Sequence, residues 1–443
     1  MSASNTLSAP LPLWIDGKEA STSTTFDVYN PSTGEKVWSS CGATAKEATE
    51  AVESAQRAFK SWRKTKPAER RQILLKAADV MESRRAELKE YMALETGALD
   101  GFSEFNVSTT IEVFRNVAGL VSNINGIIPQ TQAPGTGAFV FKEPYGVIYG
   151  MAPWNAPYIL GSRAFLYAIA AGNTCVFKGS ELSPRATWAF GSIMHEAGLP
   201  AGVLNVIYHR PEDAVSVTNT VIEHPAVKKI NFTGSTAVGS ILSSIAGKQL
   251  KPVLMELGGK ASAIVCEDAD IEKAAMQCAL GAFFHAGQIC MSTERILVHS
   301  SIIDKFAEAL KACTEKVYPP SVEAPVLIAK AGAKKNKALR EDAEKKGAKF
   351  LYGDVASKEN SEHHIRPAIV SGVTKDMDIF YTESFGPTVS LIAIDSDEQA
   401  IEMANDTDYG LSGAVFTESL GRGLRIAREI DSGAVHINSM TVQ

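Results

Sequence analysis

Cys290 is the residue of this sequence best placed for covalent chemistry. It lies in the stretch FHAGQICMSTER, residues 284–295, between a helix-like segment and the strand-like run RILVH. A packing cysteine usually lies within an apolar run, whereas this thiol occupies a predicted loop beside polar residues, where reactive groups tend to be displayed. Because an accessible thiolate attacks electrophilic carbon, the position predicts a nucleophile.

Glu256 is the candidate for a base that would activate water against a covalent intermediate. It ends the strand-like run PVLME and is followed by Gly258 and Gly259. A carboxylate at a strand end, beside a flexible turn, can be aimed into a site. Taken alone, the same position is typical of a solvated strand end, so the assignment depends on the rest of the pattern.

Trp154 and Asn155 directly follow another strand-like run, GVIYGM. The Asn155 amide is a suitable hydrogen-bond donor to a developing oxyanion. The alternative is a turn residue before Pro157, because asparagine is a common turn former.

Two further strand ends carry groups that suit a nucleotide. Lys178 and Glu181 lie at the end of NTCVFK, and ligands of open α/β sheets lie outside the carboxyl ends of strands. The run KKINFT leads into Gly234, Ser235 and Gly239 at a predicted helix start, where backbone N–H groups favour a phosphate. A solvent-facing loop and a simple capped helix start are the respective alternatives.

Glu383 and Phe385 lie in the turn ESFGP, which enters the strand-like run TVSLIAI. The carboxylate could bind a sugar hydroxyl, and the aromatic ring could pack on a planar group. A turn that merely starts a strand would have a similar sequence.

The order of elements predicts an α/β protein with parallel strands. Apolar residues recur at helical spacing from Thr44 to Ile124, and from Gly146 onward short apolar runs alternate with amphipathic segments. Strands that alternate with helices pair in parallel, with helices on both faces of the sheet. The 443 residues suffice for two open α/β domains, the second beginning near Pro252.

Composition excludes several classes of protein. With 45% hydrophobic residues and a net charge of −6, the chain has no general electrostatic attraction to nucleic acid or to an anionic membrane. No apolar run is long enough to cross a bilayer. The six cysteines are dispersed, without C-x-x-C or zinc spacing, so we expect no metal and a reducing, cytoplasmic location.

Taken in order, the segments PWN, FKGSE, FTGST, MELGGK, GQICMSTER and ESFGP resemble the aldehyde dehydrogenase superfamily. The similarity runs from LWIDGKEA near the amino end to GAVHIN near the carboxyl end. The resemblance implies NAD(P)-dependent oxidation of an aldehyde to a carboxylic acid. Cys290 would form a thiohemiacetal and then a thioester, Asn155 would hold the oxyanion, and water activated by Glu256 would hydrolyse the thioester.

The resemblance also implies the cofactor contacts. Lys178 and Glu181 match positions at the adenosine ribose, and Trp154 and Ser235 match positions beside the pyrophosphate. Glu383 with Phe385 matches the nicotinamide-ribose and ring contacts. A carboxylate at position 181 favours NAD, because it would repel the 2′-phosphate of NADP, although NADP use is compatible with such a pair.

The residues of these motifs are most similar to those of the branch that contains salicylaldehyde, benzaldehyde and vanillin dehydrogenases. We therefore expect an aromatic aldehyde as the small-molecule partner. Tyr158, Arg163 and Phe284 are candidates for the substrate pocket, and ordinary helix packing and surface charge are the alternative.

The resemblance implies a Rossmann-like NAD-binding domain over residues 1–127 and 144–252 and a catalytic domain over 253–430. Residues 128–143 and 431–443 would form a β excursion and bridging segment for a homodimer or larger oligomer. Because the sequence ends soon after GAVHIN, we expect a C-terminal truncation that leaves this segment incomplete and the oligomer weakened. A non-catalytic dinucleotide-binding or subunit-interaction protein is the alternative function.

Overall fold

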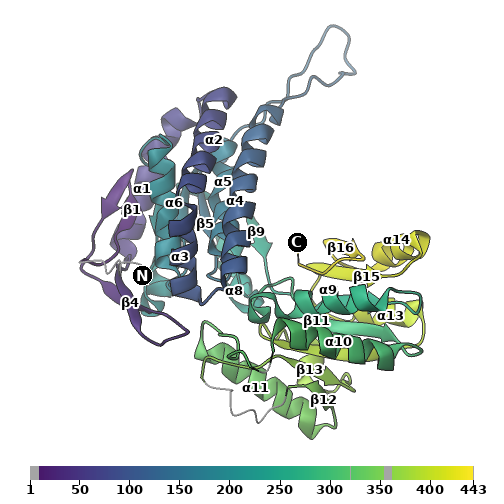
Figure 1. Ribbon diagram of the computed structural model, residues 1–443. Coiled ribbons are helices and arrows are strands. Elements are labelled where there is room, and N and C mark those ends of the chain that lie inside the picture. Colours follow the sequence, from purple (N-terminus) through teal and green to yellow (C-terminus); the bar gives the residue numbers. More distant parts are fainter. Residues whose placement is uncertain (1–8, 320, 354–361, 443) are drawn as a thin grey trace. The chain divides into compact units, whose positions relative to one another are not determined.

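The computed structural model describes residues 9–319, 321–353 and 362–442, and the chain packs as two compact units, Met1–Glu256 (unit 1) and Leu257–Gln443 (unit 2) (Figure 1). Each unit is built on an open sheet that is mostly parallel. The predicted fold class is therefore confirmed. Residues 1–8 and 443, at the outer ends of the predicted domain ranges, lie outside the described residues.

The sheet of unit 1 has the strand order β2-β1-β7-β6-β5-β8-β9. Its strands are β1 (Leu13–Ile15), β2 (Lys18–Ala20), β5 (Val147–Met151), β6 (Thr174–Lys178), β7 (Leu204–Ile207), β8 (Val227–Thr233) and β9 (Val253–Glu256). From β7 to β9 all pairings are parallel, whereas β1 pairs antiparallel with β2 and with β7. The motif-bearing ends of β5, β6, β8 and β9 therefore share one edge of the sheet.

Helices cover both faces of this sheet, as alternating strands and helices predict. One face contacts α1, and α5 and α6 pack on the other, with α2, α3 and α4 outside them (Figure 1). The helices are α1 (Ala45–Trp62), α2 (Pro67–Ser83), α3 (Arg85–Thr96), α4 (Asp100–Leu120), α5 (Pro157–Ala170), α6 (Pro184–Glu196), α7 (Ala214–Glu223) and α8 (Thr236–Lys248), with short 3₁₀ turns at Val121–Asn123 and Pro211–Asp213. The predicted helical opening, from Thr44 to Ile124, is confirmed.

The sheet of unit 2 has the order β12-β13-β14-β11-β10-β15-β16, and only β12 with β13 pairs antiparallel. Its strands are β10 (Ala261–Val265), β11 (Thr293–His299), β12 (Lys349–Tyr352), β13 (Ala368–Ser371), β14 (Thr388–Ile394), β15 (Ser412–Phe416) and β16 (Ala434–Ile437). Its helices are α9 (Ile271–Phe283), η3 (Phe284–Gly287), α10 (Ile303–Val317), α11 (Lys330–Lys345), α12 (Asp378–Tyr381), α13 (Asp397–Asn405) and α14 (Leu420–Glu429).

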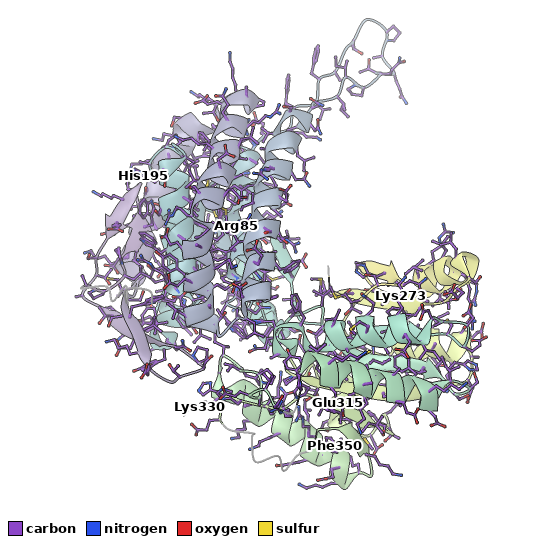
Figure 2. The ribbon with its side chains drawn as sticks, in the orientation of Figure 1. Arg85, His195, Lys273, Glu315, Lys330 and Phe350 are labelled. Carbon is purple, nitrogen blue, oxygen red and sulfur yellow. The ribbon has the colours of Figure 1, made fainter. Side chains whose placement is uncertain are left out.

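Two apolar cores lie on opposite faces of this second sheet. One contains Phe283 of α9 and Phe306 of α10, and the other contains Leu339 of α11 and Ile426 of α14. The outer surfaces of α9 and α10 carry exposed charged side chains such as Lys273 and Glu315 (Figure 2). This alternation of buried and exposed faces is the pattern from which the helices were predicted.

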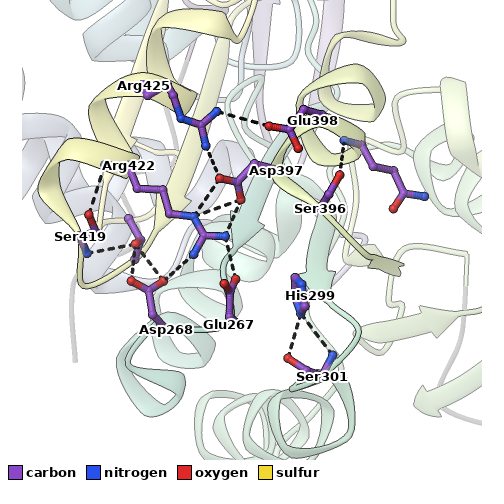
Figure 3. A network of polar contacts seen from close by, with 12 residues as sticks. Glu267, Asp268, His299, Ser301, Ser396, Asp397, Glu398, Ser419, Arg422 and Arg425 are labelled. Atoms are coloured by element: carbon purple, nitrogen blue, oxygen red, sulfur yellow. Dashed lines mark hydrogen bonds and ion pairs between the residues drawn. The ribbon is translucent and has the colours of Figure 1, made fainter.

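At the carboxyl ends of β10, β14 and β15, an ionic network ties unit 2 together (Figure 3). The Arg422 guanidinium pairs with Glu267 at 2.7 Å, with Asp268 at 3.3 Å and with Asp397, which also pairs with Arg425. The Arg422 guanidinium holds the pKa of Asp397 below its usual range. Cys290 precedes β11, so this network fixes the opposite end of the sheet from the thiol.

Some strands lie outside their predicted places. β9 pairs with β8 in unit 1, although residues 253–256 were assigned to the second domain, and β16 pairs with β15, although its residues were assigned to the bridging segment. In both cases the strand pairs in parallel with the strand before it, across the single connecting helix α8 or α14. Strands β1 to β4, the latter two being Thr25–Tyr29 and Lys36–Cys41, were not predicted: β1 and β2 have three residues each, and β3 and β4 mix polar with apolar residues.

Candidate functional site

Cys290 lies in a tight turn between η3 and β11. The backbone N–H of Ser292 donates to the carbonyl of Ile289 at 2.9 Å, which closes the turn around the thiol. The Gln288 side chain donates to the Val326 carbonyl at 3.2 Å and accepts from the Ile328 N–H at 3.0 Å. The turn is thus anchored on both sides while the Cys290 residue stays half-buried, an exposure that suits a nucleophile.

The approach to this turn is strained. His285, Ala286 and Gly287 have consecutive positive φ angles of 49°, 56° and 70°. Left-handed backbone is costly for residues with a Cβ and persists where the surroundings enforce it, often at functional sites. Burial also lowers the pKa of His285 to about 3, so its imidazole is too weak a base to take a thiol proton near neutrality.

Three predicted motifs of unit 2 meet at the Cys290 turn. The Gly259 N–H donates to Glu383 Oε1 at 2.9 Å, and a Cβ on Gly259 would lie 2.2 Å from the Cys290 carbonyl oxygen. A Cβ on Gly287 would similarly lie 2.3 Å from the Gly386 carbonyl oxygen. The segments around Gly258, Cys290 and Glu383, far apart in the sequence, are therefore in direct backbone contact.

Gly259→Ala tests this contact. Because the obstructing atom is backbone, the added methyl group must displace the Cys290 turn, and a misplacement of about 1 Å can cost roughly 100-fold in rate. We expect kcat to fall by about that factor while the protein stays folded, measured by steady-state kinetics and thermal unfolding. Gly421→Ala on α14, where a Cβ meets nothing within 4 Å, is the matched control. An unchanged kcat in Gly259→Ala would show that the turn tolerates displacement.

In unit 1, the predicted residues gather at the carboxyl edge of the sheet. Trp154 and Asn155 follow β5 and precede α5, and the Asn155 side chain is buried. The chain runs outward from β5 through β6 and β7 on one side and through β8 and β9 on the other, so the order reverses between β5 and β8. Such a switch point is where open α/β sheets bind ligands.

Lys178 and Glu181 face each other at the end of β6. Lys178 Nζ lies 3.8 Å from Glu181 Oε2, and burial lowers the pKa of Lys178 although Glu181 opposes the shift. The neighbouring His209 is buried, and burial together with Lys178 lowers its pKa to about 4. This edge therefore presents one cation and one carboxylate beside a neutral imidazole.

Ser235 caps the amino end of α8, where its Oγ accepts from the Val238 N–H at 3.4 Å. The segment therefore begins a capped helix, an arrangement compatible with the predicted phosphate site. The Gly234 N–H donates to the carbonyl of Glu256 at 3.0 Å, and Glu256, the last residue of β9, is exposed. Gly239 is buried one turn into the helix. The predicted phosphate segment and the predicted base therefore lie side by side within unit 1.

The three candidates for the substrate pocket differ in how deeply their side chains are buried. Tyr158 is fully buried, packs edge-on against Phe190 and donates from its hydroxyl to the Leu88 carbonyl at 2.7 Å. That environment fits the packing alternative. Arg163 is exposed on α5, and Phe284 is half-buried directly after α9.

Glu95 was not predicted from the sequence, although it stabilises the start of the helix that follows Lys178 and Glu181. Its buried carboxyl accepts from the N–H groups of Arg185 at 2.7 Å and Ala186 at 3.0 Å, and from Trp38 Nε1 at 3.1 Å. It therefore caps α6, the helix that follows Glu181. An acidic residue in an amphipathic helix, here α3, gives no sequence signal of such burial.

The pH dependence of protein stability tests the protonation state of the Glu95 carboxyl. Burial raises its pKa from 4.5 to about 8. Below pH 4.5 both folded and unfolded chains hold the proton; between pH 4.5 and about 8 the unfolded chain has lost it and the folded chain keeps it, so the free energy of unfolding falls across this window. We expect Glu95→Gln to flatten the fall of the melting temperature across this range. Equal slopes for variant and wild type would contradict the shift.

The amino-acid sequence is similar to known proteins over nearly its whole length. The sequence pattern of the "Aldehyde dehydrogenase family" matches residues 14–443. The chain belongs to the aldehyde dehydrogenase family. A vanillin dehydrogenase of Pseudomonas fluorescens is 41% identical over 440 residues, 98% of this chain and 90% of that protein.

Solved structures of aldehyde dehydrogenases agree with this membership. A Pseudomonas putida salicylaldehyde dehydrogenase complexed with salicylaldehyde matches with a TM-score of 0.94 and 38% identity, covering 98% of this chain and 90% of that one. A Staphylococcus aureus betaine aldehyde dehydrogenase in complex with NAD+ matches with a TM-score of 0.91 and 30% identity, covering 98% and 88%.

As a member of the aldehyde dehydrogenase family, the protein is an oxidoreductase, and the non-catalytic alternative is not favoured. Within the described residues, no group of three or more histidine, cysteine or acidic side chains is arranged to hold a metal ion. The described helices also include none with the length and apolarity needed to cross a membrane.

Proposed function

We propose that this aldehyde dehydrogenase oxidises an aromatic aldehyde to its carboxylic acid with NAD, using Cys290 as the nucleophile. The observation that supports the site most strongly is the contact of the Cys290 turn with Gly259, whose N–H binds Glu383. The family's nucleophile motif and its nicotinamide-ribose motif thus meet within unit 2.

The proposed chemistry divides among three side chains. Cys290 Sγ attacks the aldehyde carbon, and the Asn155 amide and the Cys290 N–H donate to the oxyanion of the thiohemiacetal. Loss of hydride from the carbon leaves a thioester on Cys290. Glu256 takes a proton from water, whose oxygen displaces the thiolate and releases the carboxylic acid.

The residues of the proposed cofactor site fit NAD(P). Family membership and relatives solved with NAD+ support its use, and when bound it supplies the hydride acceptor. In this assignment Lys178 and Glu181 bind the adenosine ribose, Trp154 and the start of α8 at Gly234 and Ser235 bind the pyrophosphate, and Glu383 and Phe385 bind the nicotinamide end. Glu181 would repel a 2′-phosphate, so NAD is preferred over NADP.

Relatives that are named for salicylaldehyde and vanillin support the aromatic substrate. The test is NADH formation by the purified chain with salicylaldehyde or benzaldehyde, beside propanal as an aliphatic control. Chromatography should recover the carboxylic acid in the absence of coenzyme A. We expect a higher kcat/KM for the aromatic aldehydes, and equal or lower values would contradict the assignment.

A homo-oligomer is also proposed, with a second copy on the excursion that follows α4. Ile127 and Val140 form an antiparallel bridge there, and Ile128, Phe139 and Phe141 expose most of their surface. Exposed apolar side chains that are grouped in one hairpin favour an interface in which a partner buries them. Light scattering should give a mass that is a multiple of the single chain, and a monomeric mass at micromolar concentration would refute the proposal.

A further inference from the structure

Glu294 has no part in the chemistry proposed so far, yet it lies four residues after Cys290 and is almost fully buried. Its carboxylate accepts from Lys260 Nζ at 2.6 Å, from the Ser384 N–H at 2.8 Å, from Ser384 Oγ at 2.8 Å and from the Phe385 N–H at 3.1 Å. From β11, the strand that follows the Cys290 turn, this side chain therefore contacts the other two segments that meet at that turn: Gly258 to Lys260 and the Glu383 turn.

The pair formed by Lys260 and Glu294 is a costly feature to retain for stability alone. The two side chains are 0% and 4% exposed, and burying both charges removes hydration that their mutual attraction only partly replaces. Apolar side chains of similar volume would serve a purely structural role equally well. The four polar contacts of the Glu294 carboxylate are what an apolar replacement could not provide.

The turn that Glu294 holds is strained and bears two proposed cofactor contacts. Phe385 has a φ of 46°, which is unfavourable for an aromatic residue. From α11, Asn336 Nδ2 donates to the Ser384 carbonyl at 3.0 Å, so the turn is fixed from two sides. Glu383, next to Ser384, is then held with its Oε1 on the Gly259 N–H.

We propose that Glu294, paired with Lys260, is a positioning residue that fixes the turn of Glu383 and Phe385 for the nicotinamide end of the cofactor. The inference rests on the proposed function of those two residues. Glu294 touches neither cofactor nor substrate in this assignment; it sets the conformation of the residues that do. Its loss should weaken NAD binding more than it changes the reactivity of the Cys290 thiol.

Glu294→Gln tests the proposal, with Glu315→Gln on the exposed surface of α10 as the matched control (Figure 2). Loss of a charge-assisted contact to the turn should raise the Kd for NAD, measured by calorimetry, by about tenfold or more. The rate at which iodoacetamide alkylates Cys290 without NAD should change by less than about threefold, since that thiol lies in a turn closed by its own backbone bond. Glu315→Gln should leave both values unchanged.

Two further variants separate positioning from stability. Lys260→Met combined with Glu294→Gln removes both buried charges; we expect it to recover the melting temperature lost in the single variant while the NAD Kd stays raised. Ser384→Ala keeps the ion pair and removes one contact to the turn, so it should fold and raise the NAD Kd by about fivefold.

Full recovery of NAD binding in the double variant would overturn the proposal, because Glu294 would then only neutralise Lys260. An unchanged NAD Kd in Ser384→Ala and in folded Glu294→Gln would overturn it equally. If the wild-type chain binds NAD normally, such results leave the proposed function standing. Failure of the wild-type chain to bind NAD would refute the proposed function and the positioning role together.

Discussion

Cys290→Ala is expected to abolish aldehyde oxidation, with a loss in kcat of at least about 1,000-fold, and to leave NAD binding intact. The thiol is the only side chain in the proposed mechanism that forms a bond to substrate carbon, so no neighbouring side chain replaces it. The Cys290 turn is closed by backbone and Gln288 contacts that do not involve Sγ. Alanine should therefore remove the chemistry without unfolding the loop.

The other cysteines are poor substitutes for Cys290 as the nucleophile. All five are buried, and burial raises the pKa of Cys175 and of Cys266 to about 12, so these thiols stay protonated near neutrality. Cys313→Ala, a change at a buried position of α10, is the control and should retain most activity. Steady-state NADH formation and NAD calorimetry on both variants provide the measurement. Turnover by Cys290→Ala at the wild-type rate would disprove the nucleophile assignment.

The positions of the proposed catalytic and cofactor residues on their elements followed from the sequence because short patterns determine them. Apolar runs such as VIYGM and TCVFK became β5 and β6, and parallel pairing put Asn155 and Glu181 at one edge of the sheet. The run RILVH became most of β11, which left Cys290 in a turn at its start. A buried parallel strand needs a continuous apolar run, so the sequence reveals where it ends.

The supporting residues could not be predicted in the same way, because their partners are distant in sequence. Glu294 contacts Ser384, 90 residues later, and Glu95 contacts Ala186, 91 residues later. Each is a single charged residue in an otherwise ordinary segment, and solvent exposure is the normal expectation for it. The one available signal was the pair Glu294 and Arg295 at the start of a buried strand, where both charges require partners.

Arg295 shows how such a charge is accommodated. Its guanidinium donates to the carbonyls of Met403 at 2.9 Å and Ala404 at 2.8 Å, at the carboxyl end of α13. Burial lowers its pKa to about 10, which still leaves it charged near neutrality. The negative end of the helix dipole and these carbonyls replace the lost hydration. Neither the helix end nor its orientation can be read from the residues around position 295.

Glu256→Gln is expected to slow turnover by about 100-fold or more while the first oxidation per active site proceeds. Glu256 acts, in the proposed mechanism, on the water that cleaves the thioester and not on the aldehyde carbon. Rapid mixing with NAD and excess aldehyde should therefore give a burst of NADH close to one equivalent per site, followed by a slow steady state. The wild-type chain should show a smaller burst if its hydrolysis keeps pace with oxidation.

Glutamine preserves the size of the side chain, and the bond from the Gly234 N–H goes to the backbone carbonyl of Glu256, so β9 should keep its place. Glu223→Gln, at the exposed end of α7, is the control and should behave as wild type. Mass spectrometry of the quenched variant should find the acyl group on Cys290. A variant that is slow without a burst would instead place Glu256 at or before thiol attack, as the group that takes the thiol proton. The two outcomes differ in whether an acyl-enzyme accumulates, so one experiment assigns the step at which this carboxylate acts.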